Sequence, residues 1–171
     1  MKQKVILISI DGMRPDGFLA CNHPFIHEMM KLGAYTLSGR TVFPSVTLPC
    51  HMSMFHSVPP ERHGITANVY TPPVRPINGL FEQIKYGGGV SAMYYGWEPL
   101  RDVSRPASLK FSQYINAQLD DDMTIPQFYI GKSFTPGQVL SDVSILDLAP
   151  TIAHIMGIPA ADEWEGKALI Q

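Results

Sequence analysis

The chain is poor in cysteine, in charged residues and in long apolar runs. Of its 171 residues only Cys21 and Cys50 are cysteines, and 16% are charged. Two cysteines build no disulfide framework, so we expect a reducing compartment and a cytoplasmic protein. No stretch approaches the roughly 20 consecutive apolar residues that a membrane-spanning helix needs. We therefore expect no membrane partner.

The chain also has no cluster of basic residues. Its 13 Lys and Arg stand against 15 Asp and Glu, which gives a formal net charge of −2. This balance offers little attraction to the phosphate backbone of a nucleic acid, so we expect no nucleic-acid polymer as a partner. Lys2 and Lys4 precede an apolar run, Val5–Ile10, but the run is too short for a signal peptide and ends at Asp11.

The remaining composition is that of a compact globular chain. Hydrophobic residues make up 45% of it, and a chain of this length buries close to 70% of its unfolded surface on folding. We predict a single domain over residues 1–171.

Two apolar runs have the character of buried strands. Val5–Ile10 is almost continuously apolar and rich in β-branched residues, as in a central strand covered on both faces, and Val90–Tyr95 is a second such run. Asp11 follows the first run directly, where ligands of open α/β sheets bind. By position alone, Asp11 is either a metal ligand or a helix cap.

Helical spacing of apolar residues appears in three further segments. It predicts helices over Pro24–Leu32 and Asn78–Lys85, and a final helix that begins with Asp147 as its N-cap and closes at Gly157. Ile125–Ile130 is predicted to be a strand at the edge of a sheet, because Pro126 lacks a backbone N–H.

The strongest functional prediction concerns Thr47. It precedes Leu48 and Pro49, and apolar residues then recur until the Pro59-Pro60 pair. Thr favours the N-cap and Pro is tolerated in a first helical turn, so Thr47 is predicted at the open end of a helix of about three turns. Unpaired N–H groups and the helix dipole attract anions there. Thr47 is either a nucleophile towards phosphate esters or simply a cap.

Asn68 is a second polar residue with two interpretations. It follows a His63-Gly64 turn. Its side-chain amide either donates a hydrogen bond to a phosphate oxygen or satisfies the backbone of the turn.

Five stretches, taken in order, carry a family resemblance. They are Val5–Asp16, Phe43–His51, Pro60–Asn68, Tyr95–Asp102 and Val143–Ala153. Together they resemble the type I phosphodiesterase/nucleotide pyrophosphatase family of the alkaline phosphatase superfamily. The resemblance implies an α/β fold, a three-layer sandwich around a mostly parallel sheet. It also implies hydrolysis of phosphodiester or nucleotide pyrophosphate bonds in a small phosphoester or nucleotide substrate.

The same resemblance assigns roles to three residues. Asp11 is implied to be a ligand to one zinc ion of a two-metal site. Thr47 is implied to be the metal-bound nucleophile that forms a phospho-enzyme intermediate, and Asn68 to hydrogen-bond a phosphate oxygen. A divalent ion would lower the pKa of the threonine hydroxyl, and a second would steady the leaving oxygen. Hydrolysis of phosphomonoesters or sulfate esters belongs to the same superfamily, but nothing in these residues predicts it.

The chain departs from the family pattern near residues 114–122. Relatives carry a long segment there with most of the metal ligands, so the fold is predicted to be truncated by an internal deletion. Asp11 and Thr47 supply two ligands, whereas a catalytic zinc ion needs at least three from the protein. His51 and His63 stand at motif positions that are structural in relatives.

Three explanations of this departure remain open. The chain is a short form with little or no activity, or it takes ligands from Asp120–Asp122 or a neighbouring subunit of an oligomer, or it is an incomplete version of a longer protein. Three adjacent aspartates favour harder ions such as Mg²⁺ or Ca²⁺ over zinc. The deletion should also expose apolar surface, which favours self-association.

Overall fold

The structure is a computed structural model that describes residues 3–73, 75–115, 127–129 and 131–170. No helix in this part of the chain is both long enough and apolar enough to cross a membrane. The elements in chain order are α1 (Pro15–Ala20), α2 (Pro24–Leu32), β1 (Ala34–Thr36), α3 (Thr47–His56), α4 (Pro60–His63), α5 (Leu80–Tyr86), β2 (Ala92–Tyr95), η1 (Glu98–Val103), β3 (Phe111–Tyr114), β4 (Gln127–Tyr129), η2 (Ile145–Asp147) and α6 (Leu148–Met156).

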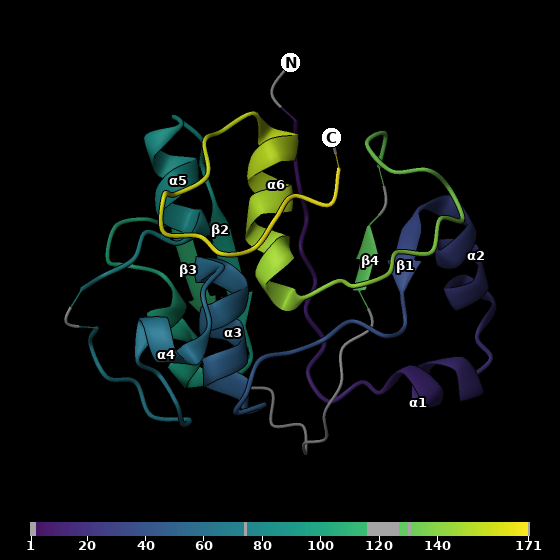
Figure 1. Ribbon diagram of the computed structural model, residues 1–171, viewed down its shortest axis with the longest axis horizontal. Helices are drawn as coiled ribbons and strands as arrows, with labels where there is room; N and C mark the ends of the chain where they lie inside the picture. Colours follow the sequence, from purple (N-terminus) through teal and green to yellow (C-terminus); the bar gives the residue numbers. More distant parts are fainter. Residues whose placement is uncertain (1–2, 74, 116–126, 130, 171) are drawn as a thin grey trace.

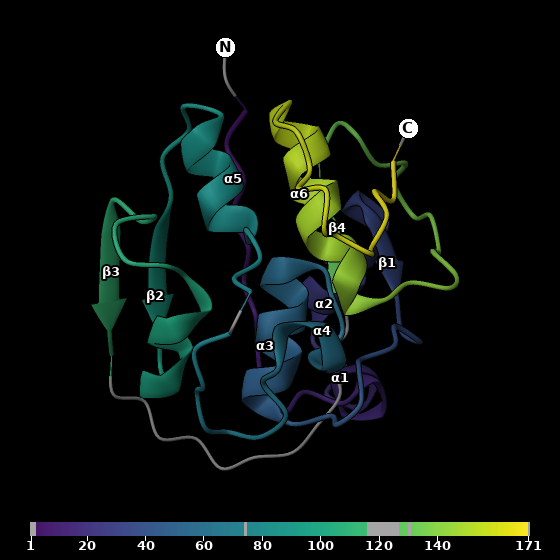
Figure 2. The same cartoon turned by 60° about the vertical axis from the view of Figure 1, so that its left-hand side comes forward.

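The strands of the described residues form two separate two-stranded sheets. β1 pairs with β4 in the antiparallel sense, and β2 pairs with β3 in the parallel sense. The two sheets lie on opposite sides of α3 and α6 (Figures 1 and 2). The α/β class and a parallel sheet are therefore present. A three-layer sandwich around one larger sheet is not found among the described residues.

Helix α3 is the centre of the packed part of the molecule. Pro49 sits in its first turn, and Ser57 ends it in the left-handed conformation with φ 54°. Every residue of α3 after Thr47 is buried. The ring of Phe55 stacks on that of Phe81 from α5, with centroids 4.9 Å apart. Further core residues from other elements include Val103, Ile145, Leu148, Ala149 and Ile152.

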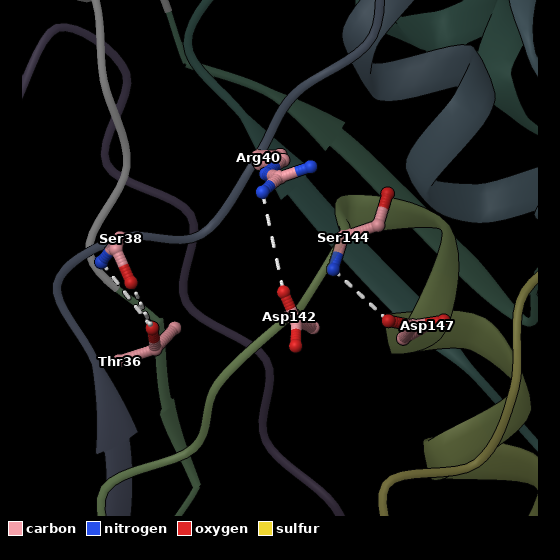
Figure 3. Close-up of polar contacts among 6 residues, drawn as sticks. All are labelled: Thr36, Ser38, Arg40, Asp142, Ser144 and Asp147. Carbon is pink, nitrogen blue, oxygen red and sulfur yellow. Dashed lines mark hydrogen bonds and ion pairs between the residues drawn. The ribbon is translucent and has the colours of Figure 1, made fainter.

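The segment before α3 is tied to the segment before α6. The backbone N–H of Arg40 donates to the carbonyl of Val143 at 2.8 Å, and that of Ile145 donates to the carbonyl of Arg40 at 3.1 Å. Figure 3 shows that the side chains of Arg40 and Asp142 also face each other, 4.0 Å apart. These contacts fix the approach of the chain to α3.

The predicted helix after Asp147 is confirmed, and Asp147 holds the predicted N-cap position, although its side chain makes no capping bond. Helix α6 closes at Gly157 with φ 63°, as predicted, because a residue without a side chain adopts this conformation readily. Asp147 itself ends the short helix η2 and has helical angles, with no capping bond to α6. Its carboxylate instead accepts a hydrogen bond from the N–H of Ser144 at 2.9 Å, which Figure 3 shows, and another from the N–H of Lys167 at 2.9 Å. Ser144 is the residue that caps η2.

The prediction of a buried strand at Val5–Ile10 is wrong. Residues 3–10 form no strand, and none of them makes a backbone hydrogen bond to another described residue. Ile6 and Ile8 are 86% and 77% exposed. This extended segment (residues 3–10) runs between the two sheets without joining either (Figures 1 and 2). A strand needs neighbouring strands to satisfy its backbone, and the described residues provide none.

The other predicted elements are found in modified form. Val90–Tyr95 contains strand β2, but the residues of β2 are half-buried or exposed, so it is not the buried strand that was predicted. Pro24–Leu32 is α2, with His23 as its cap, and Asn78–Lys85 corresponds to α5. Of Ile125–Ile130, only β4 lies within the described residues. The stretch 116–122, where a deletion was predicted, lies outside them.

Candidate active site

Thr47 begins the central helix, as the sequence predicts, although the N-cap is the preceding residue, Val46. Thr47 is half-buried, and its hydroxyl makes no hydrogen bond to another described residue. Val46 is extended and has no side chain that can cap, so capping falls to a residue from elsewhere in the chain. The hydroxyl of Thr47 is therefore not used as a cap, and one of its two interpretations is removed.

The capping residue is Asn68. Its side-chain oxygen accepts a hydrogen bond from the backbone N–H of Leu48 at 2.9 Å. Pro49 has no N–H, and the N–H of Cys50 already donates to the carbonyl of Val46 at 3.0 Å. Most backbone N–H groups that were expected to be unpaired at this end of the helix therefore already have acceptors. Within the described chain, the N–H of Thr47 itself is the one left in the first turn without a partner.

The bond to Leu48 also fixes the orientation of the Asn68 amide. A backbone N–H needs an acceptor, so the oxygen must face the helix and the NH₂ group must point away from it. Asn68 is exposed, and no described residue accepts from its NH₂ group. The residue therefore caps the helix, and the described residues leave its two NH₂ donors unused. The alternative that it satisfies its own turn is wrong.

Asp11 lies near the same end of α3. It is exposed, and its carboxylate accepts a hydrogen bond from the N–H of Gly12 at 3.0 Å. It does not cap α1, whose N-cap is Arg14. Burial raises the pKa of the Cys50 thiol, a hydrogen bond from Thr41 opposes this, and the negative charge of Asp11 raises it further. Asp11 is therefore within electrostatic reach of the first turn of α3.

The histidines nearby are committed to structural bonds. His51 Nδ1 donates to the carbonyl of Thr47 at 2.8 Å, and its Nε2 faces the Ser9 hydroxyl at 3.4 Å. His63 accepts from the N–H of Ile65 and contacts the hydroxyl of Ser53. Burial lowers the pKa of His63 to about 4, so this ring is neutral. The interpretation of both histidines as structural agrees with these contacts.

The described residues do not fit a catalytic zinc site. They contain no group of three or more His, Cys, Asp and Glu side chains placed to hold a metal ion. Asp11 and Thr47 offer one carboxylate and one hydroxyl, which is short of the three protein ligands that such a site requires. Asp120–Asp122, the acidic residues considered as substitutes, lie outside the described residues.

Comparison with known proteins supplies the context for this arrangement. A profile of the type I phosphodiesterase / nucleotide pyrophosphatase family matches residues 5–130. The chain belongs to this family. The matched range contains Asp11, Thr47 and Asn68, so all three residues of the candidate site lie within the part of the chain that defines this phosphodiesterase family.

Three relatives illustrate the similarity. Human ectonucleotide pyrophosphatase/phosphodiesterase family member 5 is 36% identical over 74 residues, 43% of this chain and 16% of the relative. Human family member 1 is 31% identical over 112 residues, 61% of this chain and 11% of the relative. A bis(5'-adenosyl)-triphosphatase from Xenopus laevis is 38% identical over 65 residues, 38% of this chain and 14% of the relative. The matched part thus spans 11–16% of these relatives' lengths.

Sequence reasoning missed two contacts of this site. One joins Leu48 to Asn68, 20 positions apart, and no local pattern indicates it. The other joins Ser9 to His51. His51 stands four positions after Thr47, on the same face of the helix, and also bonds the Thr47 carbonyl. That spacing is a signal in the sequence by which His51 could have been placed next to Thr47, but it gives no indication of the contact with Ser9.

Proposed function

We propose that this phosphodiesterase-family chain takes part in the hydrolysis of phosphodiester or nucleotide pyrophosphate bonds, with Thr47 as the nucleophile. The observation that carries the proposal is the hydrogen bond from the N–H of Leu48 to the Asn68 oxygen, which places the Asn68 amide at the end of α3 that Thr47 begins and leaves its NH₂ donors unused by the described residues. The names of the relatives, pyrophosphatase/phosphodiesterase and bis(5'-adenosyl)-triphosphatase, support a small phosphoester or nucleotide as the substrate.

The proposed reaction has two displacements at phosphorus. Thr47 Oγ forms a bond to phosphorus while the bond to one leaving oxygen breaks, and that oxygen departs with its alcohol or phosphate group. The phosphoryl group, still carrying its other substituent, is then ester-linked to Thr47. Water then attacks the same phosphorus and releases Thr47. In both steps the Asn68 NH₂ group and the free N–H of Thr47 would donate to non-bridging oxygens, where negative charge builds up. No described residue accepts a hydrogen bond from the Thr47 hydroxyl.

A second candidate function is that of a short homologue with impaired catalysis that retains phosphate or partner binding. Two observations favour it. The described residues gather fewer than three metal ligands, and no described strand pairs with the extended segment. In this case Thr47 and Asn68 would bind an anion without turning it over. The alkaline-phosphatase-like sandwich would then be an incomplete version of the family's fold.

Turnover of a nitrophenyl phosphodiester with added Zn²⁺ or Mn²⁺ tests the leading candidate. We expect Thr47→Ala to abolish nitrophenol release, because no oxygen remains to attack phosphorus, and Thr47→Ser to retain part of it. Equal rates for Thr47→Ala and the unchanged protein would remove Thr47 from the mechanism. Calorimetry separates the two candidates, since tight binding of two Zn²⁺ per chain would rule out the impaired homologue.

Two substitutions of Asn68 separate its cap from its donors. Asn68→Asp keeps an oxygen for the N–H of Leu48 but has no NH₂ group. It should preserve stability while lowering kcat by about 100-fold or more. Asn68→Ala should lower kcat similarly and also cost about 1 kcal/mol of stability through the lost cap. If Asn68→Asp retains full activity, the amide donors have no part in the reaction.

A further inference from the structure

The extended segment has few attachments to the rest of the molecule. Its backbone makes no hydrogen bond to the described residues outside it. One side-chain hydrogen bond joins it to them, between Ser9 Oγ and His51 Nε2 at 3.4 Å. Asp11 follows the segment directly, and this contact is made by Ser9, two positions before it.

The chemistry of His51 determines the direction of that hydrogen bond. Its Nδ1 lies 2.8 Å from the carbonyl oxygen of Thr47, which can only accept, so Nδ1 carries the proton. In the neutral ring Nε2 is then an acceptor, and the Ser9 hydroxyl is the donor. His51 is 4% exposed and therefore held firmly in the core. A single imidazole thus bonds the Thr47 backbone on one side and the extended segment on the other.

The exposure of the extended segment agrees with this contact. Val5 and Leu7 are 36% and 38% exposed, whereas Ile6 and Ile8 are 86% and 77% exposed. Side chains alternate between the two faces of extended backbone, so Ser9 lies on the same face as Val5 and Leu7, the face towards the protein. Asp11, two positions after Ser9, begins the turn that follows the segment.

We propose that His51 is a positioning residue that holds the Ser9–Asp11 end of the extended segment against the first turn of α3, so that Asp11 and Thr47 serve one phosphoester site. Its value to catalysis rests on the function proposed above, whereas the placement of the segment does not. The Ser9 hydroxyl and the His51 ring are the two halves of this link.

Distances between spin labels test the placement without any need for activity. One label is attached at Ile10→Cys, at the end of the extended segment, and one at Glu61→Cys, on α4, which packs against α3. Cys21→Ser removes the exposed native thiol. We expect a narrow distance distribution in the protein with Ser9 and His51. Ser9→Ala and His51→Leu should broaden and shift it, because the segment loses its attachment.

Matched variants keep this test decisive. Ser9→Thr retains the hydroxyl and should restore the narrow distribution, and Ser112→Ala, an exposed serine on β3, should leave it unchanged. Ser9 is exposed, so Ser9→Ala should fold even if His51→Leu does not. Identical distributions in Ser9→Ala and the unchanged protein would overturn the proposal.

The kinetic consequence is measured separately on the nitrophenyl phosphodiester. Where the protein turns it over, Ser9→Ala should lower kcat by about 10- to 100-fold with little change in KM, because a misplaced group mainly slows the chemical step. A protein without turnover contradicts the proposed function but leaves the label distances to decide the role of His51. If Ser9→Ala keeps the full kcat while its label-distance distribution broadens, the catalytic part of the proposal is overturned.

Discussion

Helix α3 and the extended segment are both strongly apolar stretches, and they lie side by side at the candidate site. Every residue of α3 after Thr47 is buried. Every residue from 3 to 10 is exposed, although this stretch contains four of the most hydrophobic side chains in succession, Val5 to Ile8. Hydrophobicity alone therefore does not decide which stretch enters the core.

The difference lies in where each backbone finds its hydrogen bonds. A helix pairs its own N–H and C=O groups, so α3 needs only apolar surfaces to pack against, and α5, α6, η1 and η2 provide them. A strand pairs with other strands, and none of the described strands reaches the extended segment. A lack of strand partners therefore affects a strand far more than a helix.

Truncation of one side chain in each region gives the largest expected contrast. Leu48 of α3 is fully buried at 0% exposure, whereas Ile8 is 77% exposed. Leu48→Ala should cost about 3 kcal/mol in the free energy of unfolding, because it leaves a cavity in a packed core. Ile8→Ala should change it by less than about 0.5 kcal/mol. Urea unfolding measures both, and a cost above about 2 kcal/mol for Ile8→Ala would show that the extended segment is packed after all.

The same contrast explains which structural predictions succeeded. Helices α2, α3, α5 and α6 depend on local signals such as Pro in a first turn and Gly at the end, and each was found close to its predicted bounds. The strand at Val5–Ile10 depends on partners distant in sequence, which its own residues do not reveal. Strand β1 was missed because three residues, Ala34–Thr36, carry too little pattern to be recognised.

The candidate site was predictable to a similar degree. The place of Thr47 at the start of a helix followed from the residues just after it, and it was confirmed. The choice between the two roles of Asn68 required knowing that Leu48 lies next to it, a contact across 20 positions. The roles of Asp11, Thr47 and Asn68 in phosphoryl transfer stay predictions, as does a cytoplasmic location.

Acid sensitivity should also distinguish the two regions, with a smaller effect. His63, which is 2% exposed and contacts Ser53 of α3, has its pKa lowered by burial from 6.5 to about 4. Between these values the unfolded chain binds more protons at this site than the folded protein does. Stability from this group is therefore full above about pH 6.5 and is lost as the pH falls towards 4. Burial lowers the pKa of His56 too, so it adds to the same loss.

Urea unfolding at several pH values measures this acid sensitivity. Compared with the unchanged protein, His63→Gln should lose less stability between pH 6.5 and pH 4, the two values that bound the titration of the histidine. Its stability at neutral pH should be lower, because the hydrogen bonds to Ser53 and Ile65 are disturbed. An unchanged slope against pH would mean that the His63 ring is charged or solvated in the folded protein.

The last prediction concerns self-association through the extended segment, where a substitution should change assembly strongly and stability very little. The exposed side chains Ile6 and Ile8 and the unpaired backbone beside them form an edge that attracts further strands, so the protein should self-associate. Ile8→Lys should reduce this association while shifting the free energy of unfolding by less than about 0.5 kcal/mol. Phe25→Lys, at a site 61% exposed on α2, is the matched control and should leave the association unchanged. Sedimentation velocity across a range of concentrations measures both variants. A protein that stays monomeric at every concentration would mean that the extended segment, unlike α3, needs no apolar cover at all.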